Sequence, residues 1–507
     1  MTGPADPNPP RRWAALAVLC ASLLMVGMDL TVLHVAVPTI GRELLPSGSE
    51  LLWIVDGYAL TVAAGLLTFG TLGDRYGRRR VLVLGFAVFG LASVAAAASV
   101  VPAALIAARV LLGVGGAMIM SCTPAVIRVV FPDDRERTVA IGLWVAAYSV
   151  GVSAGPVLGG LLLEHFWWGS VFLVNLPVVA LALVGGVLLV PESKDPRARR
   201  WDAPGAALSA LGLGGLVHAV QELGEGSGPE AVTWIVGAAA LGLLVAFVRR
   251  QRRIRHPLVD LAQFADRRFS LAALCVMGCY GAYATLLFLL TQRLQLVEGY
   301  SPLAAGLALV PLAAANAVGA ALAPRLSARF GRHRGLSGGL VLLGLALAAF
   351  SVVGPAGTVV ALVAAGLGAG AVMTLGADAM LGAAEPERAG EVGGIQETSF
   401  SLGAGLGLAV LGTVLSLVYR SMFPPVPGSD RADWETARTS LGAAVEVAGG
   451  RGGDALLVAA RQAFDTAFSV TTALTAAALM LLGAVAVVGL RPAARPSRSE
   501  EREECSA

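Results

Sequence analysis

Long apolar runs constrain this chain more than any other feature. Each has roughly the 20 residues that a helix needs to cross a bilayer, and short charged segments separate them. Only 14% of the residues are charged, whereas a soluble protein carries about 25%. We therefore predict an all-α polytopic membrane protein. Fourteen spans are expected, at residues 13–38, 51–72, 81–100, 103–127, 138–162, 168–190, 204–221, 231–248, 268–291, 303–324, 336–353, 357–384, 391–419 and 463–490.

The distribution of positive charge predicts how the chain is oriented. If the N-terminus is cytoplasmic, most of the 37 Lys and Arg residues fall in the inner segments. Lys and Arg are enriched on the cytoplasmic side of membrane proteins. We therefore expect a multi-pass protein of the plasma membrane with both termini in the cytoplasm.

Two inner segments resemble each other and indicate a duplicated architecture. Residues 73–80 read Gly-Asp-Arg-Tyr-Gly-Arg-Arg-Arg and follow span 2, whereas residues 327–334 read Ser-Ala-Arg-Phe-Gly-Arg-His-Arg and follow span 10. Parallel repeats about a central axis are a transporter design, with the substrate path at their interface. The organisation predicted is a tail at 1–12, a six-helix bundle at 13–190, two inserted helices at 191–250, a second six-helix bundle at 251–490 and a tail at 491–507.

The second bundle includes a long outer loop at 420–462. Its stretch 433–447 has a helical pattern. A helical hairpin that shields the outer mouth and a passive linker both fit this sequence.

Five acidic residues lie within or beside the apolar runs. An ionised carboxylate costs about 3 kcal/mol at the centre of a membrane helix, so a cavity that uses its charge is the expected setting. Desolvation favours the protonated form of a carboxyl group, and a buried acid can then hold either a proton or an organic cation. This competition is a simple physical basis for antiport. The candidates for proton coupling and substrate binding are Asp29, Asp56, Asp378, Glu391 and Glu397.

Asp29 is the first choice because it lies near the middle of span 1; a polar pin between helices is the alternative. Asp56 lies about 9 Å into span 2 and fits a cavity mouth or an interfacial position equally. Asp378 and Glu397 should both lie about 9 Å from the inner surface. Glu391 is expected at the inner mouth, where solvation is the simpler interpretation.

Arg109 and a glycine stripe are further candidates. Arg109 is a lone cation in an apolar run and needs a counter-charge, a carbonyl or water, although snorkelling to an interface is an alternative. Gly151, Gly155 and Gly159 form one smooth face on span 5, and Pro156 can bend that helix. This face is interpreted as a pliable contact across the two halves or as plain packing.

The first inner loop contains an acid among its arginines. Asp74 can pair with Arg75, Arg78 or Arg79 to latch one half to the other when the inner side is closed; a solvated loop is the alternative. The second copy has Ala328 at the position of Asp74, so only the first copy can latch in this way.

Five motifs carry a family resemblance. They are Gly73-Asp74-Arg75-Tyr76-Gly77-Arg78-Arg79, Arg109-Val110-Leu111-Leu112-Gly113, the stretch 151–160 (GVSAGPVLGG), Met28-Asp29-Leu30-Thr31-Val32 and Trp53-Ile54-Val55-Asp56-Gly57-Tyr58. The chain resembles the fourteen-helix drug:proton antiporter family of the major facilitator superfamily, the QacA- and SmvA-like multidrug efflux transporters.

The resemblance implies a fold of two six-helix bundles plus two inserted helices, with Arg109 facing the cavity. The family often has an acid in span 10 and paired acids in span 13, where this chain has Asn316 and Gln396. We therefore hypothesise that Asp378 compensates for the missing acids.

The expected function is proton-coupled export of lipophilic, mostly cationic drugs, with small-molecule drugs, protons and the lipid bilayer as partners. An exporter of one neutral or anionic antibiotic or metabolite is the alternative. No cofactor, metal or nucleic acid is expected, and we expect a monomer. A nucleophile–base pair, a metal-ligand cluster and a phosphate loop are all missing from the sequence, so it predicts a protein that is not an enzyme.

Overall fold

The computed structural model describes residues 9–194, 201–224, 231–254, 257–258, 261–350, 355–383, 389–427, 429–451 and 454–490. All the regular elements in these ranges are helices. Thirteen of the helices are long and apolar enough to cross a membrane. They account for all the predicted spans except 336–353, which corresponds to α13 (Arg332–Ala349). The all-α membrane architecture is therefore confirmed, whereas the two tails lie largely outside the described residues.

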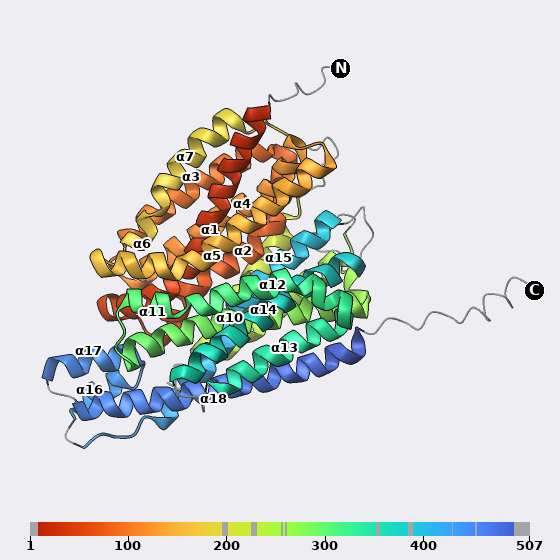
Figure 1. Ribbon diagram of the computed structural model, residues 1–507. Helices are drawn as coiled ribbons and strands as arrows, with labels where there is room; N and C mark the ends of the chain where they lie inside the picture. Colours follow the sequence, from red (N-terminus) through yellow and green to blue (C-terminus); the bar gives the residue numbers. More distant parts are fainter. Residues whose placement is uncertain are drawn as a thin grey trace, which may run out of the picture.

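The first half of the chain forms one bundle, coloured red to yellow in Figure 1. Prolines and caps fix several of its helix starts: Ser47 and Glu50 form a reciprocal capping box at α2, and Pro102 occupies the first turn of α4. The sixth predicted span is split at Val174 into two helices. The helices are α1 (Pro9–Leu44), α2 (Gly48–Tyr76), α3 (Arg78–Ala97), α4 (Pro102–Val130), α5 (Asp134–His165), α6 (Ser170–Leu173) and α7 (Asn175–Leu189).

The second half forms a matching bundle, coloured green to blue. Its first long helix ends in a π-helical turn, η2 (Arg293–Val297), and its second predicted span is divided at Leu309. The other elements are η1 (Gln263–Ala265), α10 (Arg267–Gln292), α11 (Pro302–Ala308), α12 (Val310–Phe330), α13, α14 (Pro355–Ala383), α15 (Ala389–Met422), α16 (Arg431–Ala437), α17 (Leu441–Arg451) and α18 (Asp454–Gly489).

The duplicated loops have the same local geometry in both halves. Gly77 separates α2 from α3 with φ 118°, and Gly331 separates α12 from α13 with φ 85°. Each donates its N–H to the carbonyl four residues earlier, at 2.9 Å. Positive φ values favour glycine, so the repeated glycine has a conformational cause. We call the end of the molecule that carries these two loops the arginine-rich end.

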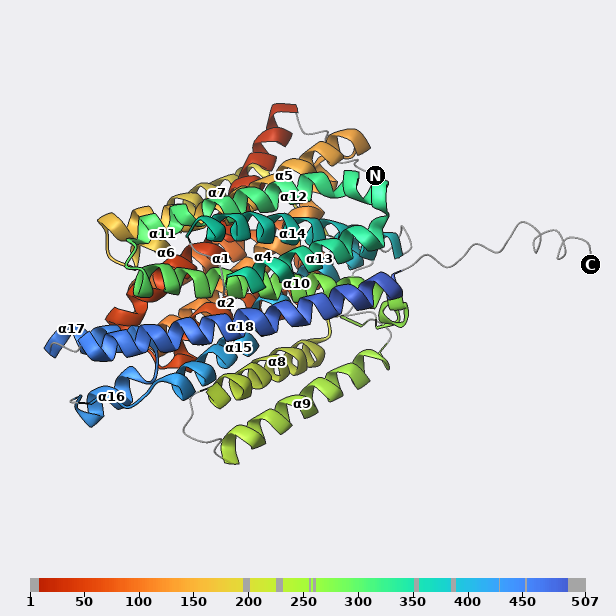
Figure 2. The ribbon, with the colours of Figure 1, turned by 60° about the horizontal axis from the view of Figure 1, so that its bottom comes forward.

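The two inserted helices differ in how deeply they are integrated. Helix α8 (Ala203–Gly224) packs against α2 of the first half and α15 of the second, whereas α9 (Ala231–Gln251) packs on α8 and lies at the edge (Figure 2). Large apolar side chains of α9, such as Trp234 and Ile235, are exposed, as expected for a lipid-facing helix. Helix α8 therefore bridges the seam between the halves.

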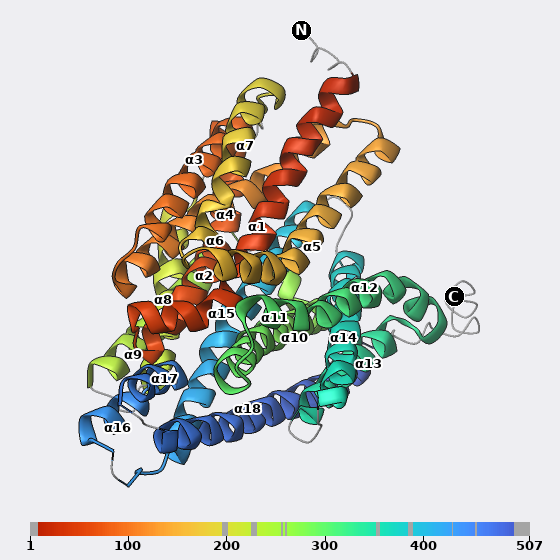
Figure 3. The same cartoon turned by 60° about the vertical axis from the view of Figure 1, so that its left-hand side comes forward.

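The halves meet at the end opposite the arginine-rich loops. There, α5 contacts α11 and α2 contacts α15. Figure 3 shows the two bundles diverging from this junction toward the ends that carry the N- and C-termini. Helices α16 and α17 lie at the same end as the junction, which we call the hairpin end.

The predicted helical stretch of the long loop is present as two short helices. They break at Arg438, and α17 continues to Arg451. Trp434 Nε1 donates to the carbonyl of Pro424 at 2.9 Å, and Tyr419 Oη donates to that of Ala437 at 2.9 Å. These bonds fix α16 to the end of α15, and shielding of the outer mouth stays a prediction.

Candidate functional site

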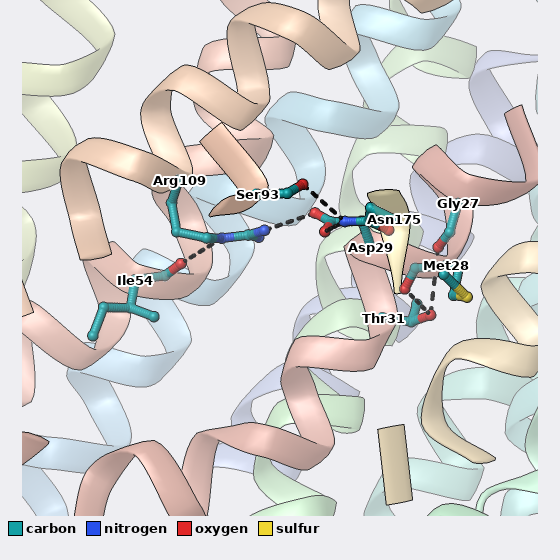
Figure 4. A network of polar contacts seen from close by, with 8 residues as sticks. All are labelled: Gly27, Met28, Asp29, Thr31, Ile54, Ser93, Arg109 and Asn175. Carbon is teal, nitrogen blue, oxygen red and sulfur yellow. Dashed lines mark hydrogen bonds and ion pairs between the residues drawn. The ribbon is translucent and has the colours of Figure 1, made fainter. Parts of the chain in front are cut away.

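A buried ion pair joins two of the predicted residues. Arg109 Nη1 lies 2.8 Å from Asp29 Oδ2, and the two side chains are 1% and 0% exposed (Figure 4). Arg109 Nε donates to the carbonyl of Ile54 at 3.0 Å, and the guanidinium lies 4.7 Å from the centre of the Tyr58 ring. The counter-charge, the carbonyl and the aromatic face together compensate a cation that is fully removed from water.

The other carboxylate oxygen of Asp29 is also bonded. Asn175 Nδ2 donates to Asp29 Oδ1 at 2.9 Å and lies 3.3 Å from Ser93 Oγ. Asp29, Arg109 and these partners come from α1, α2, α3, α4 and α7. The network therefore ties together five helices of the first half.

This network changes the picture of Asp29 drawn from sequence. Asp29 does not line the cavity that α1, α2 and α5 form with α10 and α15 between the halves, so the expectation that it lines a cavity is not met in this conformation. Its position matches the alternative of a polar pin between helices, with an arginine and an asparagine as its bonding partners. Arg109 does not snorkel. Its predicted need for a counter-charge is met 80 residues away in sequence.

Two adjoining narrow hollows, each of about 20 Å³, form a central cavity between the halves. Asp56 lines the first and Glu397 lines the second. Both halves contribute to the walls, with α1, α2 and α5 facing α10 and α15. Two of the predicted acids are therefore brought to one cavity. Its aromatic lining residues are Tyr58, Tyr148, Tyr280, Tyr283 and Phe400.

Asp56 is enclosed rather than interfacial. Its side chain is almost fully buried, and its Oδ2 accepts a hydrogen bond from Gln221 Nε2 of α8 at 2.9 Å. His34 lines the same hollow, and its buried Nδ1 has no hydrogen-bond partner among the described residues. Of the two positions left open from sequence, the structure supports the cavity position.

Glu397 lies among aromatic rings. The ring centres of Tyr280 and Phe400 are 5.2 Å apart, and Tyr280 stacks on Tyr283 at 6.5 Å. Glu397 is half-buried, and its carboxylate makes no hydrogen bond or ion pair to another described residue. A carboxylate beside aromatic faces suits a lipophilic organic cation, because the rings attract positive charge and cover apolar surface.

Asp378 does not line this cavity. Asp378 is exposed and pairs with Arg332 at 2.8 Å within the second half. Its position gives no support to the hypothesis that it replaces missing cavity acids. Glu391 lies in the first turns of α15, and its side chain lies outside the described residues. Asn316, which stands where the family often has an acid in span 10, donates through Nδ2 to Met373 Sδ at 3.9 Å.

The first arginine loop is held within its own half. Arg78 pairs with Asp74 at 2.8 Å, while Glu192, after α7, lies 4.0 Å from Arg79 and 3.6 Å from Arg80. Arg75 is exposed beside Tyr76. Among the described residues, the ion pairs of the first arginine loop stay within the first half, and those of the second loop stay within the second half. The predicted latch between halves is therefore not formed in this conformation.

The glycine stripe of α5 packs within the first half. A Cβ at Gly151 or Gly155 would collide with the α1 backbone or with Thr31, and one at Gly159 would collide with Val32. In this conformation the stripe is a packing contact within one half, and a pliable role for it stays a prediction. The contact across the halves comes from neighbouring positions, where Pro156 and Gly160 of α5 face α11.

Close contacts seal the cavity toward the hairpin end. Gln295 Nε2 of η2 donates to the carbonyl of Val35 at 2.9 Å, and Ser301 Oγ donates to Glu164 at 3.1 Å. Both bonds join the two halves. Beyond them lies a hollow of about 420 Å³ between the α1–α2 corner and the α16–α17 hairpin. The structure is therefore closed at the hairpin end.

Several residues of this site were missed by sequence reasoning. Gln221 and Asn175 are lone amides in apolar runs, a signal that a search restricted to charged residues passes over. Tyr280 and Tyr283 are three residues apart and so share one helical face, but aromatic residues alone do not distinguish a cavity from a core. In the described residues, no group of three or more His, Cys, Asp or Glu side chains is arranged to hold a metal ion.

Comparison with known proteins agrees with this architecture. The model of the Major Facilitator Superfamily matches residues 19–408, more than three quarters of the chain. Among solved structures, a bacterial homologue of the human lysosomal transporter Spinster, in an inward-facing and unoccupied conformation, superimposes with a TM-score of 0.68. That match has 19% sequence identity and covers 96% of this chain and 100% of the other.

Two curated relatives align over nearly their whole lengths. Multidrug efflux pump LfrA of Mycolicibacterium smegmatis is 37% identical, and the alignment covers 95% of this chain and 97% of the relative. Methyl viologen resistance protein SmvA of Salmonella typhimurium is 36% identical, with 93% of this chain and 96% of the relative covered.

Proposed function

Because the chain belongs to the Major Facilitator Superfamily, we propose that it is a proton-coupled antiporter that exports lipophilic, mostly cationic drugs by alternating access. The observation that carries this proposal is the cavity between the halves, where Asp56 and Glu397 lie among tyrosine rings. The names of the aligned relatives support the substrate class, since one is a multidrug efflux pump and the other a methyl viologen resistance protein.

The walls of the cavity suit a flat or greasy cation. The stacked pair of Tyr280 and Tyr283 offers broad apolar faces with negative potential. Glu397 adds a full negative charge when it is ionised. Most of the lining surface is apolar, so we expect shape and charge to select the substrate. Such a site tolerates many structures, which agrees with export of several drugs.

Exchange follows from competition for the same carboxylates. A proton that reaches Glu397 or Asp56 removes the charge that holds the drug cation. When the proton leaves on the cytoplasmic side, the charge returns and another cation can bind. The membrane potential contributes about 2.3 kcal/mol for each elementary charge per 100 mV. No cofactor enters this cycle, and one chain contains the whole path.

We place the arginine-rich end in the cytoplasm of a cell whose plasma membrane holds the protein, in accord with positive-inside charge. The sealed hairpin end then faces outward. In this arrangement the structure corresponds to the inward-facing state. The pairing of Asp74 with Arg78 agrees with an unlatched inner side, and a latch between the halves belongs to the opposite state.

Asp29 and Arg109 reach the cavity indirectly in this proposal. Arg109 lies on the ring of Tyr58, and Tyr58 lines the hollow that contains Glu397. The ring of Tyr58 thus lies between the buried pair and the part of the cavity where the charge changes. We propose that the pair couples the cavity to the packing of the first half, without exchanging protons in the inward-facing state.

Inside-out vesicles that contain the protein test this function. A proton gradient should drive accumulation of ethidium, and ethidium addition should partly collapse the gradient. Glu397→Gln should abolish both effects, while Glu435→Gln, on the exposed helix α16, should preserve them. Equal transport of a neutral dye would instead favour an exporter of neutral compounds, and transport without a gradient would contradict proton coupling.

A further inference from the structure

The inserted helix α8 places an amide against a carboxyl group of the cavity. Gln221 and Asp56 are each 1% exposed, and the 2.9 Å bond between them joins α8 to α2. Within the described residues, this is the one hydrogen bond to the Asp56 side chain. The residue therefore depends for its polar contact on a helix that lies outside both six-helix bundles.

The amide has an unused acceptor on its other side. Gln221 Oε1 is buried and has no hydrogen-bond partner among the described residues. A primary amide carries both donors and an acceptor, and burying an unpaired acceptor is costly. An unpaired acceptor beside a carboxyl group can accept a hydrogen bond from that group once it is protonated. The amide NH2 can donate to the carboxylate, and after rotation by about 180° its oxygen can accept from the carboxylic O–H.

Contacts on both sides of the seam hold Gln221 in place. Thr413 Oγ1 of α15 donates to the carbonyl of Val220 at 3.1 Å, one residue before Gln221. Leu60 of α2, Val217 of α8 and Ala409 of α15 form a small apolar cluster nearby. The backbone that carries the amide is thus fixed to both halves, and only its side chain has to rotate.

We propose that Gln221 is a positioning residue that hydrogen-bonds Asp56 in both of its protonation states, so that the inserted helix is part of the proton-coupling machinery. This inference rests on the proposed function, because it assigns Asp56 a proton that comes and goes. It gives the insertion a role that neither six-helix bundle supplies.

Other titratable or charged groups surround Asp56 without replacing this bond. The Arg109 guanidinium is engaged by Asp29, and the tyrosines and the histidine of the first hollow make no described hydrogen bond to Asp56. The titratable groups that line the same hollow are His34 of α1 and Tyr280 and Tyr283 of α10, and Glu397 of α15 lines the adjoining hollow.

Two substitutions separate a proton-linked role from a packing role. Gln221→Leu keeps the approximate volume but removes donor and acceptor. We expect it to lower the proton-driven transport rate about tenfold at every pH, since a hydrogen bond to a charged group is lost. Gln221→Glu keeps a hydrogen-bond donor and an acceptor while its carboxyl group is protonated. Once that group is ionised, it places a second negative charge beside Asp56. It should transport near the parental rate at acidic pH and fall steeply at alkaline pH.

Gln251→Leu is the matched control. It also removes a buried amide from the inserted hairpin, where Gln251 Nε2 donates to Asp202 at 3.0 Å, but it leaves Asp56 untouched. We expect its pH profile to keep the parental shape even if less folded protein is recovered. In an Asp56→Asn background, Gln221→Glu should no longer change the pH profile.

The assay is ethidium transport into proteoliposomes under an imposed proton gradient, per folded protein, across a series of pH values. A parental pH profile and rate in Gln221→Leu and Gln221→Glu would overturn the inference while leaving the proposed function standing. Equal losses in Gln221→Glu and Gln251→Leu with unchanged profiles would also overturn it, as packing alone would explain them. If the parental chain shows no gradient-driven transport, the proposed function itself fails.

Discussion

Removing the positive member of the buried pair should destabilise the first half strongly. Arg109→Met leaves Asp29 fully buried, with Asn175 as its remaining described partner. Breaking a buried ion pair by removing one partner costs about 3–5 kcal/mol, because an uncompensated charge stays in a low-dielectric interior. Each 1.4 kcal/mol is tenfold in an equilibrium constant, so the unfolding constant should rise by about two to three and a half powers of ten.

The charge, and not the lost volume, should cause this effect. Asp29→Asn combined with Arg109→Met removes both charges and lets the new amide bond to Asn175. The double variant should therefore recover most of the lost stability, since replacing a whole buried pair is often close to neutral. Arg80→Met, at a side chain that is 72% exposed, is the control and should stay near the parental value.

Reversible unfolding of the purified protein in mixed micelles, followed by circular dichroism, measures these differences. The reasoning predicts a much lower stability for Arg109→Met than for the double variant. If Arg109→Met were no less stable than Arg80→Met, the pair would not brace the first half. If the double variant were as unstable as the single one, packing of the long side chain would explain the loss instead of charge.

Three further predictions address the cavity, the seal and the outlying acid. Glu397→Gln should keep binding of a neutral lipophilic dye but weaken tetraphenylphosphonium binding at least tenfold, which equilibrium dialysis can measure; equal weakening of both would contradict an electrostatic role. The valine side chain of Gly306→Val has no room against the α5 backbone, and overpacking costs about 1–3 kcal/mol. The α5–α11 contact should therefore open, and a cysteine introduced at Ala284 should become more reactive to a thiol reagent added at the hairpin side. Unchanged reactivity would show that the α5–α11 contact is not the seal. Asp378→Asn breaks an exposed pair with Arg332 and should change stability by less than about 1 kcal/mol, with proton-driven ethidium transport retained; its loss would revive the compensation hypothesis.

Much of the fold could be predicted from the sequence because the bilayer imposes a length on each apolar run. The repeated loops were informative for a similar reason. Gly77 and Gly331 both need positive φ, and such a requirement leaves a local trace in the sequence. The breaks at Val174 and Leu309 were not predicted, although Pro177 and Pro311 follow them closely and proline favours the first turn of a helix.

The candidate site was predicted only in part, because its chemistry depends on which helices meet. Asp29 and Arg109 were both recognised as unusual, but their pairing joins residues 80 positions apart. Helix length placed Asp378 and Glu397 at similar depths. Their side chains point to different surroundings, and depth along a helix does not determine which face reaches the cavity. Gln221 was missed because the insertion had no assigned contact with either half.

Proton release on cation binding tests the central claim most directly. Purified protein in nanodiscs, in weakly buffered solution with a pH indicator, is mixed with tetraphenylphosphonium at a series of pH values. The account predicts that binding releases protons, and that the release disappears in the variant that combines Asp56→Asn with Glu397→Gln. Tight cation binding without proton release at any pH, or release that persists in this double variant, would contradict exchange at these carboxylates.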